Sequence, residues 1–305
     1  RSGEFFEFFP ETVTSTLDTD PIDVASTHTK VSILRHAVSF DEELLIFSDQ
    51  SQFMVTGGAT LTAGNISINV TTEFEADRKV KPVGSGSNVF FTFNKGNFTG
   101  VREFFVASDT DTKKADDITA NVPKFVPANV FKLATSTTEN ILIALSSDED
   151  NALYVFQYYV AQNKRLQSAW HKWTYGTSTS DKILNIDFIE NTLFIVNERS
   201  DGVYLETIDV SPALTDTGET YLTHLDRKLN NTQITESYNA GTNQTTITLP
   251  YAINNTMKVV GRSGASNKAG QEIATVSQSG TSIVVSGDIT AQNFFIGEQY
   301  EFEFQ

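Results

Sequence analysis

Cysteine is absent from the 305-residue sequence. Disulfide bridges, thiolate metal ligands and thiol nucleophiles are therefore excluded within it. Histidine is scarce: the four are His28, His36, His171 and His224, and none has the spacing of a zinc-binding motif. We assign these histidines no role, and we expect no metal site, no cofactor and no catalytic residue.

Long apolar runs are also missing. No stretch reaches the roughly 18 consecutive apolar residues that a membrane-spanning helix needs. The first residues lack the basic, apolar and small-residue order of a signal peptide. We therefore expect no membrane span. Because the sequence begins at Arg1 without an initiator methionine, we expect an internal fragment of a longer protein.

Basic residues are few: 22 Lys and Arg stand against 38 Asp and Glu, a net charge of −16. Affinity for nucleic acid arises largely from cations that displace counterions from phosphates. A chain this acidic should not bind DNA tightly. Acidic walls would suit a conduit through which DNA slides, but an acidic surface that only confers solubility explains the charge equally well.

Motifs of hydrolytic enzymes are missing too. No serine lies in a GxSxG elbow, and the acidic run Asp148, Glu149 and Asp150 lacks the spacing of an EF-hand calcium loop. Among 38 acidic residues some pair would always fit a glycosidase, so their number discriminates nothing. A polysaccharide or peptidoglycan hydrolase and a host-glycan-binding propeller remain the alternative functions.

Phenylalanine, with 23 residues against two Met, dominates the apolar content beside Thr, Val, Ile and Tyr. These residues favour strands over helices, which predicts an all-β fold without a convincing helix. Hairpins of similar pattern recur at 44–55, 88–106, 140–160 and 191–210. Starting points at 45, 88, 140 and 191 are 43, 52 and 51 residues apart, close to the period of a β-propeller blade.

Four repeats predict a partial β-propeller of about four blades over residues 1–214. The first strand of each hairpin is apolar, as a strand covered on both faces should be. We expect burial of Leu45, Phe47, Phe90, Leu142, Ile143, Phe194 and Val196. Residues 215–305 are richer in Gly, Asn, Thr and Ser, with short strands at close spacing, which predicts a small antiparallel β barrel or sandwich.

Trp170 and Trp173 are the only two tryptophans. Three residues apart on one predicted strand, they face opposite sides of it and cannot both lie in one core. Tryptophan is enriched at interface hot spots, so one of the two is a candidate interface anchor.

The segment that holds both tryptophans, LQSAWHKW at 166–173, also carries a resemblance. Together with GEFFEFFPETV at 3–13, the block at 20–55, the block at 116–145 and DGVYLETIDV at 201–210, it resembles tail tubular protein B, the tail nozzle protein family of T7-like short-tailed bacteriophages. With the block at 68–91 and the whole segment at 153–176, these blocks cover most of the first 210 residues in family order, whereas the last 90 residues match only loosely.

The resemblance implies a structural protein of the virion, located in the phage tail and assembled in the host cytoplasm. It implies a hexameric ring of nozzle proteins below the tail adaptor protein and beside the tail fibres. Residues 1–214 would form the propeller platform, and 215–305 would form an inserted β domain that narrows the distal exit channel. Genomic DNA would pass through on ejection without specific binding, and no enzyme activity would be involved.

Overall fold

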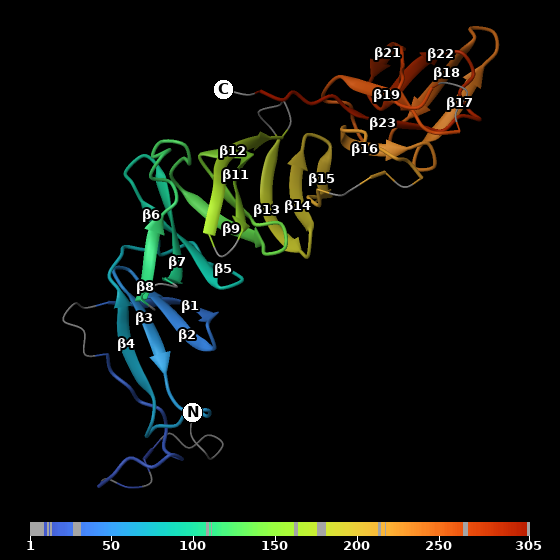
Figure 1. Ribbon diagram of the computed structural model, residues 1–305. Coiled ribbons are helices and arrows are strands. Elements are labelled where there is room, and N and C mark those ends of the chain that lie inside the picture. Colours follow the sequence, from blue (N-terminus) through green and yellow to red (C-terminus); the bar gives the residue numbers. More distant parts are fainter. Residues whose placement is uncertain are drawn as a thin grey trace. The chain divides into compact units, whose positions relative to one another are not determined.

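The computed structural model describes residues 9–10, 12, 14–26, 32–107, 110, 112–161, 164–175, 181–212, 215–216, 218–264 and 268–303. These residues contain 23 strands and no helix, which confirms the predicted all-β class. Two compact units are formed: Arg1–Trp173 with Asn185–Glu190, and Thr174–Leu184 with Asn191–Gln305. Figure 1 shows the strands, coloured along the chain.

The first unit contains three four-stranded sheets, which we call blades 1 to 3. In each, the strands lie side by side in sequence order, as in a propeller blade. Blade 1 consists of β1 (Leu34–Phe40), β2 (Glu43–Ser48), β3 (Gln52–Thr56) and β4 (Ser67–Thr72). Blade 2 consists of β5 (Val83–Ser85), β6 (Asn88–Asn94), β7 (Thr99–Ala107) and β8 (Thr112–Asp117). Blade 3 consists of β9 (Val130–Ser136), β10 (Ile141–Ser146), β11 (Glu149–Ala161) and β12 (Lys164–Thr174).

The cores of this unit lie between blades, and alternate residues of β6 serve two of them. Val89 and Phe91 pack with Leu45 and Phe47 of blade 1. Phe90 packs in a second core with Leu142 of blade 3. Successive strand residues point to opposite faces, so a continuous apolar strand fits a position between two neighbours. The predicted burial of Leu45, Phe47, Phe90, Leu142 and Ile143 is confirmed.

Blade 4 has three strands, β13 (Lys182–Ile189), β14 (Thr192–Arg199) and β15 (Gly202–Asp209). The predicted hairpin at 191–210 is confirmed, but Phe194 and Val196 are only half-buried. The fully buried side of β14 carries Leu193 and Ile195 instead. Four consecutive apolar residues give no alternation, so the sequence does not indicate which side of the strand faces the core.

The strands between residues 226 and 298 form two four-stranded antiparallel sheets, which pack as a sandwich, one of the two forms predicted for this part of the chain. One sheet has the order β16 (Asp226–Asn230), β23 (Phe294–Glu298), β19 (Met257–Gly261) and β20 (Glu272–Ile273). The other has the order β17 (Thr235–Asn239), β18 (Gln244–Thr248), β22 (Ser282–Ser286) and β21 (Thr275–Ser279). Both sheets contribute to one core, for example through Val259 and Ile296 of the first and Ile247 and Val285 of the second.

Candidate interaction sites

Trp170 is half-buried and packs against the core between blades 2 and 3. Its indole Nε1 donates a hydrogen bond to the carbonyl oxygen of Ile118 at 3.0 Å. Its ring lies 5.1 Å from that of Phe156 and 6.5 Å from that of Phe125, measured between centroids. A tryptophan that packs against a core and satisfies its N–H in this way supports the packing of blade 3 against the end of blade 2.

Trp173 has a different environment. It is half-buried, and its ring lies 5.6 Å from that of His171, its neighbour two positions earlier on β12. Burial lowers the pKa of His171, which favours a neutral imidazole. Because Trp170 is used inside the unit, Trp173 is the better candidate for an interface anchor, and this role stays a prediction.

A buried ion pair that the sequence analysis missed joins blades 2 and 3. Glu103 of β7 is 4% exposed and accepts hydrogen bonds from Asn88 Nδ2, at 2.6 Å, and from Arg165 Nη2 of β12. The Arg165 guanidinium lies 4.9 Å from the ring centroid of Tyr158. Burial raises the pKa of the Tyr158 hydroxyl. The cluster fixes one blade on the next, since a buried carboxylate needs its cation.

Blade 4 is fixed to the sandwich by a second network, which we call the joint: Arg199, Glu206, Arg227 and Glu298. Arg199 Nη2 lies 3.0 Å from Glu206 Oε1 within blade 4. Arg227 of β16 lies 3.7 Å from the same oxygen through Nε, and its Nη1 lies 3.1 Å from Glu298 Oε1 of β23. Glu206 is thus shared by one arginine of the blade and one of the sandwich.

Aromatic and backbone contacts surround the joint. The Arg227 guanidinium lies 3.6 Å from the ring centroid of Tyr251, whose hydroxyl donates to the Arg227 carbonyl at 2.7 Å. Asp201 accepts hydrogen bonds from the Tyr204 hydroxyl at 2.9 Å and from the Ala252 amide at 2.8 Å. Burial raises the pKa of Asp226, and the carboxylates of Glu298 and Glu206 raise it further. These contacts mount the sandwich on blade 4.

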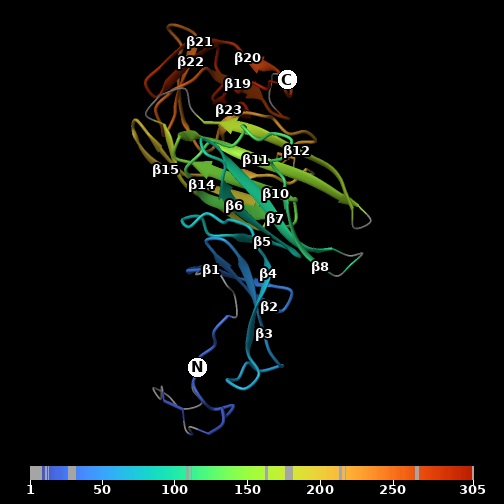
Figure 2. The ribbon, with the colours of Figure 1, turned by 90° about the vertical axis from the view of Figure 1, so that its left-hand side faces the viewer.

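Several large apolar side chains are exposed on strands and have the character of contact residues. On β15, Val203 is 61% and Leu205 is 68% exposed. Tyr159 of β11 lies two residues beyond Gln157, where the pairing with β10 ends, and it is exposed, as is Leu166 of β12. Figure 2 shows β11 and β12, which are neighbours in the sheet of blade 3. These exposed apolar residues are candidates for contacts with protein partners.

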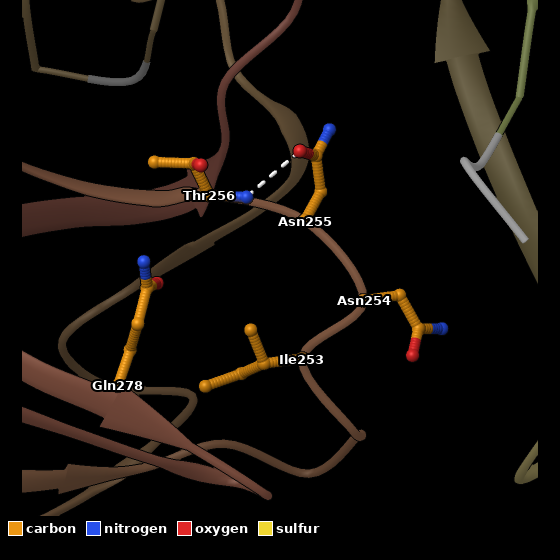
Figure 3. Close-up of a pocket in the computed structure, with 5 residues that line it drawn as sticks. All are labelled: Ile253, Asn254, Asn255, Thr256 and Gln278. Carbon is orange, nitrogen blue, oxygen red and sulfur yellow. Dashed lines mark hydrogen bonds between the residues drawn. The ribbon is translucent and has the colours of Figure 1, made fainter.

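A shallow hollow of the sandwich is lined by five residues, which Figure 3 labels: Ile253, Asn254, Asn255, Thr256 and Gln278. The Thr256 amide donates to Asn255 Oδ1 at 2.8 Å, and the Met257 amide donates to Gln278 Oε1 at 2.9 Å. None of the five side chains titrates near neutral pH, so the hollow offers no general acid or base.

The acidic run at 148–150 is engaged locally. Asp148 accepts from Asn129 Nδ2 at 2.8 Å, and Glu149 pairs with Lys172 Nζ at 2.7 Å. Within the part of the chain that the structure describes, no three His, Asp or Glu side chains gather as metal ligands. The same residues include no helix that could cross a membrane.

Comparisons with known proteins give the context of these contacts. Tail tubular protein gp12 of Escherichia phage T7 is 31% identical over 252 residues, which are 82% of this chain and 32% of that protein. The chain thus spans about a third of the length of this curated relative.

Among solved structures, the match with Hsv2p of Kluyveromyces lactis covers 75% of this chain and 67% of the Hsv2p chain, with a TM-score of 0.37 and 11% sequence identity. The match with the N-terminal domain of Nup159 covers 87% of this chain and 75% of the Nup159 chain, with a TM-score of 0.28 and 12% sequence identity. A model of the bacteriophage nozzle protein family matches residues 1–305. The chain belongs to the bacteriophage nozzle protein family.

Proposed function

We propose that the chain is part of a nozzle ring, a structural component of a phage tail that forms the distal exit channel for DNA. The observation that carries this proposal is the match of the nozzle protein family over residues 1–305. The similarity to tail tubular protein gp12 of phage T7 supports the same function. The ring would contain six copies, joined to a tail adaptor protein and tail fibres, in a virion assembled in the host cytoplasm.

Two features of the fold support a mechanical role. The blades pack through aromatic cores and a buried ion pair, and the joint fixes the sandwich on blade 4. Such contacts suit a part that must keep its shape while DNA passes. In this proposal residues 1–214 form the propeller platform and residues 215–305 form the inserted domain that narrows the channel.

Contacts between copies would use the exposed apolar residues and the half-buried Trp173. Interfaces bury anchors of this kind, which here are Trp173, Val203 and Leu205 of β15, Tyr159 of β11 and Leu166 of β12. The net charge of −16 favours passage of DNA without tight binding. The chain would therefore hold neighbours firmly and DNA weakly, without enzymatic turnover.

The test is the mass of the assembled full-length protein, measured by sedimentation velocity and native mass spectrometry. A ring of six copies is expected, and Trp173→Ala should weaken it more than Ser147→Ala, an exposed turn residue of blade 3. A protein that stays monomeric at all concentrations would contradict the proposal. Cleavage of capsule or peptidoglycan that is lost when one Asp or Glu is changed to its amide would favour the hydrolase instead.

A further inference from the structure

One side of the sandwich is almost free of charge. In the sheet of β17, β18, β22 and β21, Ile247 and Val285 point into the core, and their strand neighbours point outward. Register partners share a side of the sheet. The outward side bears two rows of register partners that run across the strands. One row is Thr235, Thr248 and Ser282, and the other is Ser237, Thr246 and Val284. We call the side that these six residues define the hydroxyl face.

The four strands of this sheet have five residues each, and Glu236 is the one charged residue among them. Charged residues make up 20% of the whole chain, so the sheet is depleted of them. Glu236 pairs with Ile247 and therefore lies on the inner side. Burial raises its pKa, the carboxylate of Asp288 raises it further, and its Oε2 has no partner among the described residues. The only carboxylate of the sheet is thus turned away from the hydroxyl face, at an energetic cost.

The opposite side of the sandwich differs. The cationic groups of Lys228 and Arg262 lie 5.1 and 4.5 Å from the ring centroid of Phe295 on β23. They pair with Asp216 at 2.5 Å and Glu219 at 3.4 Å, two residues of the segment that precedes β16. This side is therefore covered by charged groups and connecting chain, whereas the residues of the hydroxyl face are exposed or half-buried.

The composition of the hydroxyl face argues against most partners. The six defining residues include no aromatic ring for stacking on sugars or bases, and Val284 alone is apolar, although Val276 at the irregular start of β21 is also 51% exposed. A stable protein interface normally has an apolar centre. Without cations, the face cannot gain the counterion-release energy that holds phosphates.

The absence of carboxylates matters as much. Two like charges about 4 Å apart repel by about 1 kcal/mol in water and by about 4 kcal/mol at the lower dielectric constant near a protein surface. An acidic chain would therefore repel a passing polyanion wherever its carboxylates face it. A Thr or Ser hydroxyl that donates to a phosphate oxygen gives up a hydrogen bond with water, so the net gain in free energy is only a part of the strength of the bond.

We propose that the hydroxyl face is the part of this chain past which duplex DNA slides. This inference rests on the proposed function, since it names the surface of the nozzle that faces the DNA. The face neither traps the phosphates by counterion release nor repels them, so contact with the moving duplex is close and brief.

The experiment places the photo-crosslinker p-benzoylphenylalanine at Thr246 or Ser237 of the full-length protein in virions. Matched controls carry it at Ser147 or Thr138, both exposed in blade 3. Release of DNA is halted midway by external osmotic pressure, the particles are irradiated, and adducts with DNA are measured. We expect adducts with DNA at Thr246 and Ser237 and no adducts at the two control positions.

Other distributions of adducts would contradict either the assignment of the face or the proposed function. Adducts at the controls but not at the face, or equally at all four positions, would overturn the assignment of the face while leaving the DNA conduit in place. No adduct at any position would overturn the proposed function of this chain as a channel component. Only virions that contain wild-type amounts of the protein are compared. If the crosslinker at Thr246 or Ser237 prevents incorporation of the protein into virions, it is placed at Thr248 or Ser282 instead.

A second measurement changes the charge of the face. Thr246→Lys with Ser237→Lys adds two cations where phosphates pass, so DNA release should slow, and higher salt should restore it by screening. The matched pair Ser147→Lys and Thr138→Lys adds the same charge to blade 3 and should leave release unchanged. Equal release from both double variants and the wild type would contradict the proposal.

Discussion

At the scale of single residues, aromatic side chains carry much of the packing between blades. Phe90 is fully buried, and its ring centroid lies 6.1 Å from that of Tyr158. Phe40 and Phe104 pack edge to face at 5.0 Å in the core between blades 1 and 2. Rings of this size bury large areas and leave cavities when truncated.

Truncation of Phe90 should therefore destabilise the first unit. We expect Phe90→Ala to lower the free energy of unfolding by about 3 to 5 kcal/mol, from lost burial and the cavity that remains. Urea denaturation measures the change. Phe131→Ala, on β9 with 40% of the residue exposed, is the control and should cost about 1 kcal/mol or less. Equal losses in both variants would show that Phe90 does not occupy a tight core.

Asp117 provides a prediction on pH. Burial opposes its ionisation, but hydrogen bonds from Lys95 Nζ at 2.7 Å and from the Thr119 amide at 2.8 Å outweigh it and lower its pKa below 3.8. An acid with a lowered pKa in the folded state adds stability above its unfolded pKa and loses it as the pH falls through the folded pKa. Asp117→Asn should be less stable than wild type at neutral pH, and the difference should shrink in acid below pH 3.8. A difference that stays constant in urea titrations across this range would contradict the assignment.

At the scale of elements, the joint decides how the sandwich is held. The side chains of Arg227 and Glu298 are each 5% exposed, that of Arg199 is 2% exposed, and that of Glu206 is 19% exposed. Arg199 Nη1 and Arg227 Nη2 have no further partner among the described residues. The two cations therefore depend on these two carboxylates for compensation.

Removal of the shared carboxylate should loosen the joint. We expect Glu206→Gln to destabilise the second unit by about 2 to 4 kcal/mol, somewhat less than for a fully buried pair because Glu206 is partly exposed. Differential scanning calorimetry measures the loss. Asp187→Asn, which breaks an exposed pair with Lys132, is the control and should change stability by less than about 1 kcal/mol.

Replacing a buried pair as a whole should cost less than removing one partner. The double variant Arg227→Met with Glu298→Leu leaves no unpaired charge between these two positions, so it should be more stable than Glu298→Leu alone. A double-mutant cycle followed by thermal unfolding measures the coupling. Strictly additive losses would mean that the two side chains act independently despite the 3.1 Å contact.

At the scale of the whole molecule, charge and length govern behaviour. A net charge of −16 repels copies of the chain at low salt, and the Debye length falls from about 30 Å at 0.01 M to about 8 Å at 0.15 M. The chain spans 32% of the curated relative, and in a longer protein other segments would share the ring interface.

The isolated 305-residue chain should therefore be a monomer at micromolar concentration. It should also bind duplex DNA negligibly at about 0.15 M salt, since clustered cations are needed for the polyelectrolyte contribution. Light scattering and a filter-binding titration measure the two properties. A stable hexamer would show that these residues hold the whole assembly surface, and tight DNA binding would refute a weakly contacting conduit.

Local patterns in the sequence determined the all-β class and the four hairpins, because turn residues such as Asp201-Gly202 and apolar strands act over a few positions. The division at residues 214 and 215 and the interface role of Trp173 stay predictions. The buried face of β14 and the packing of Trp170 against a core were decided by tertiary structure. An apolar strand does not encode which side meets a neighbour.

The ion pairs show the same limit more strongly. Arg165 is 62 positions from Glu103, and Arg227 is 71 positions from Glu298. Among 38 acidic residues, no local pattern selects these partners. The packing of sheets brings them together and removes water around them, and this desolvation makes the pairing obligatory. The hydroxyl face likewise exists only because strand register gathers the uncharged residues of β17, β18 and β22 on one side.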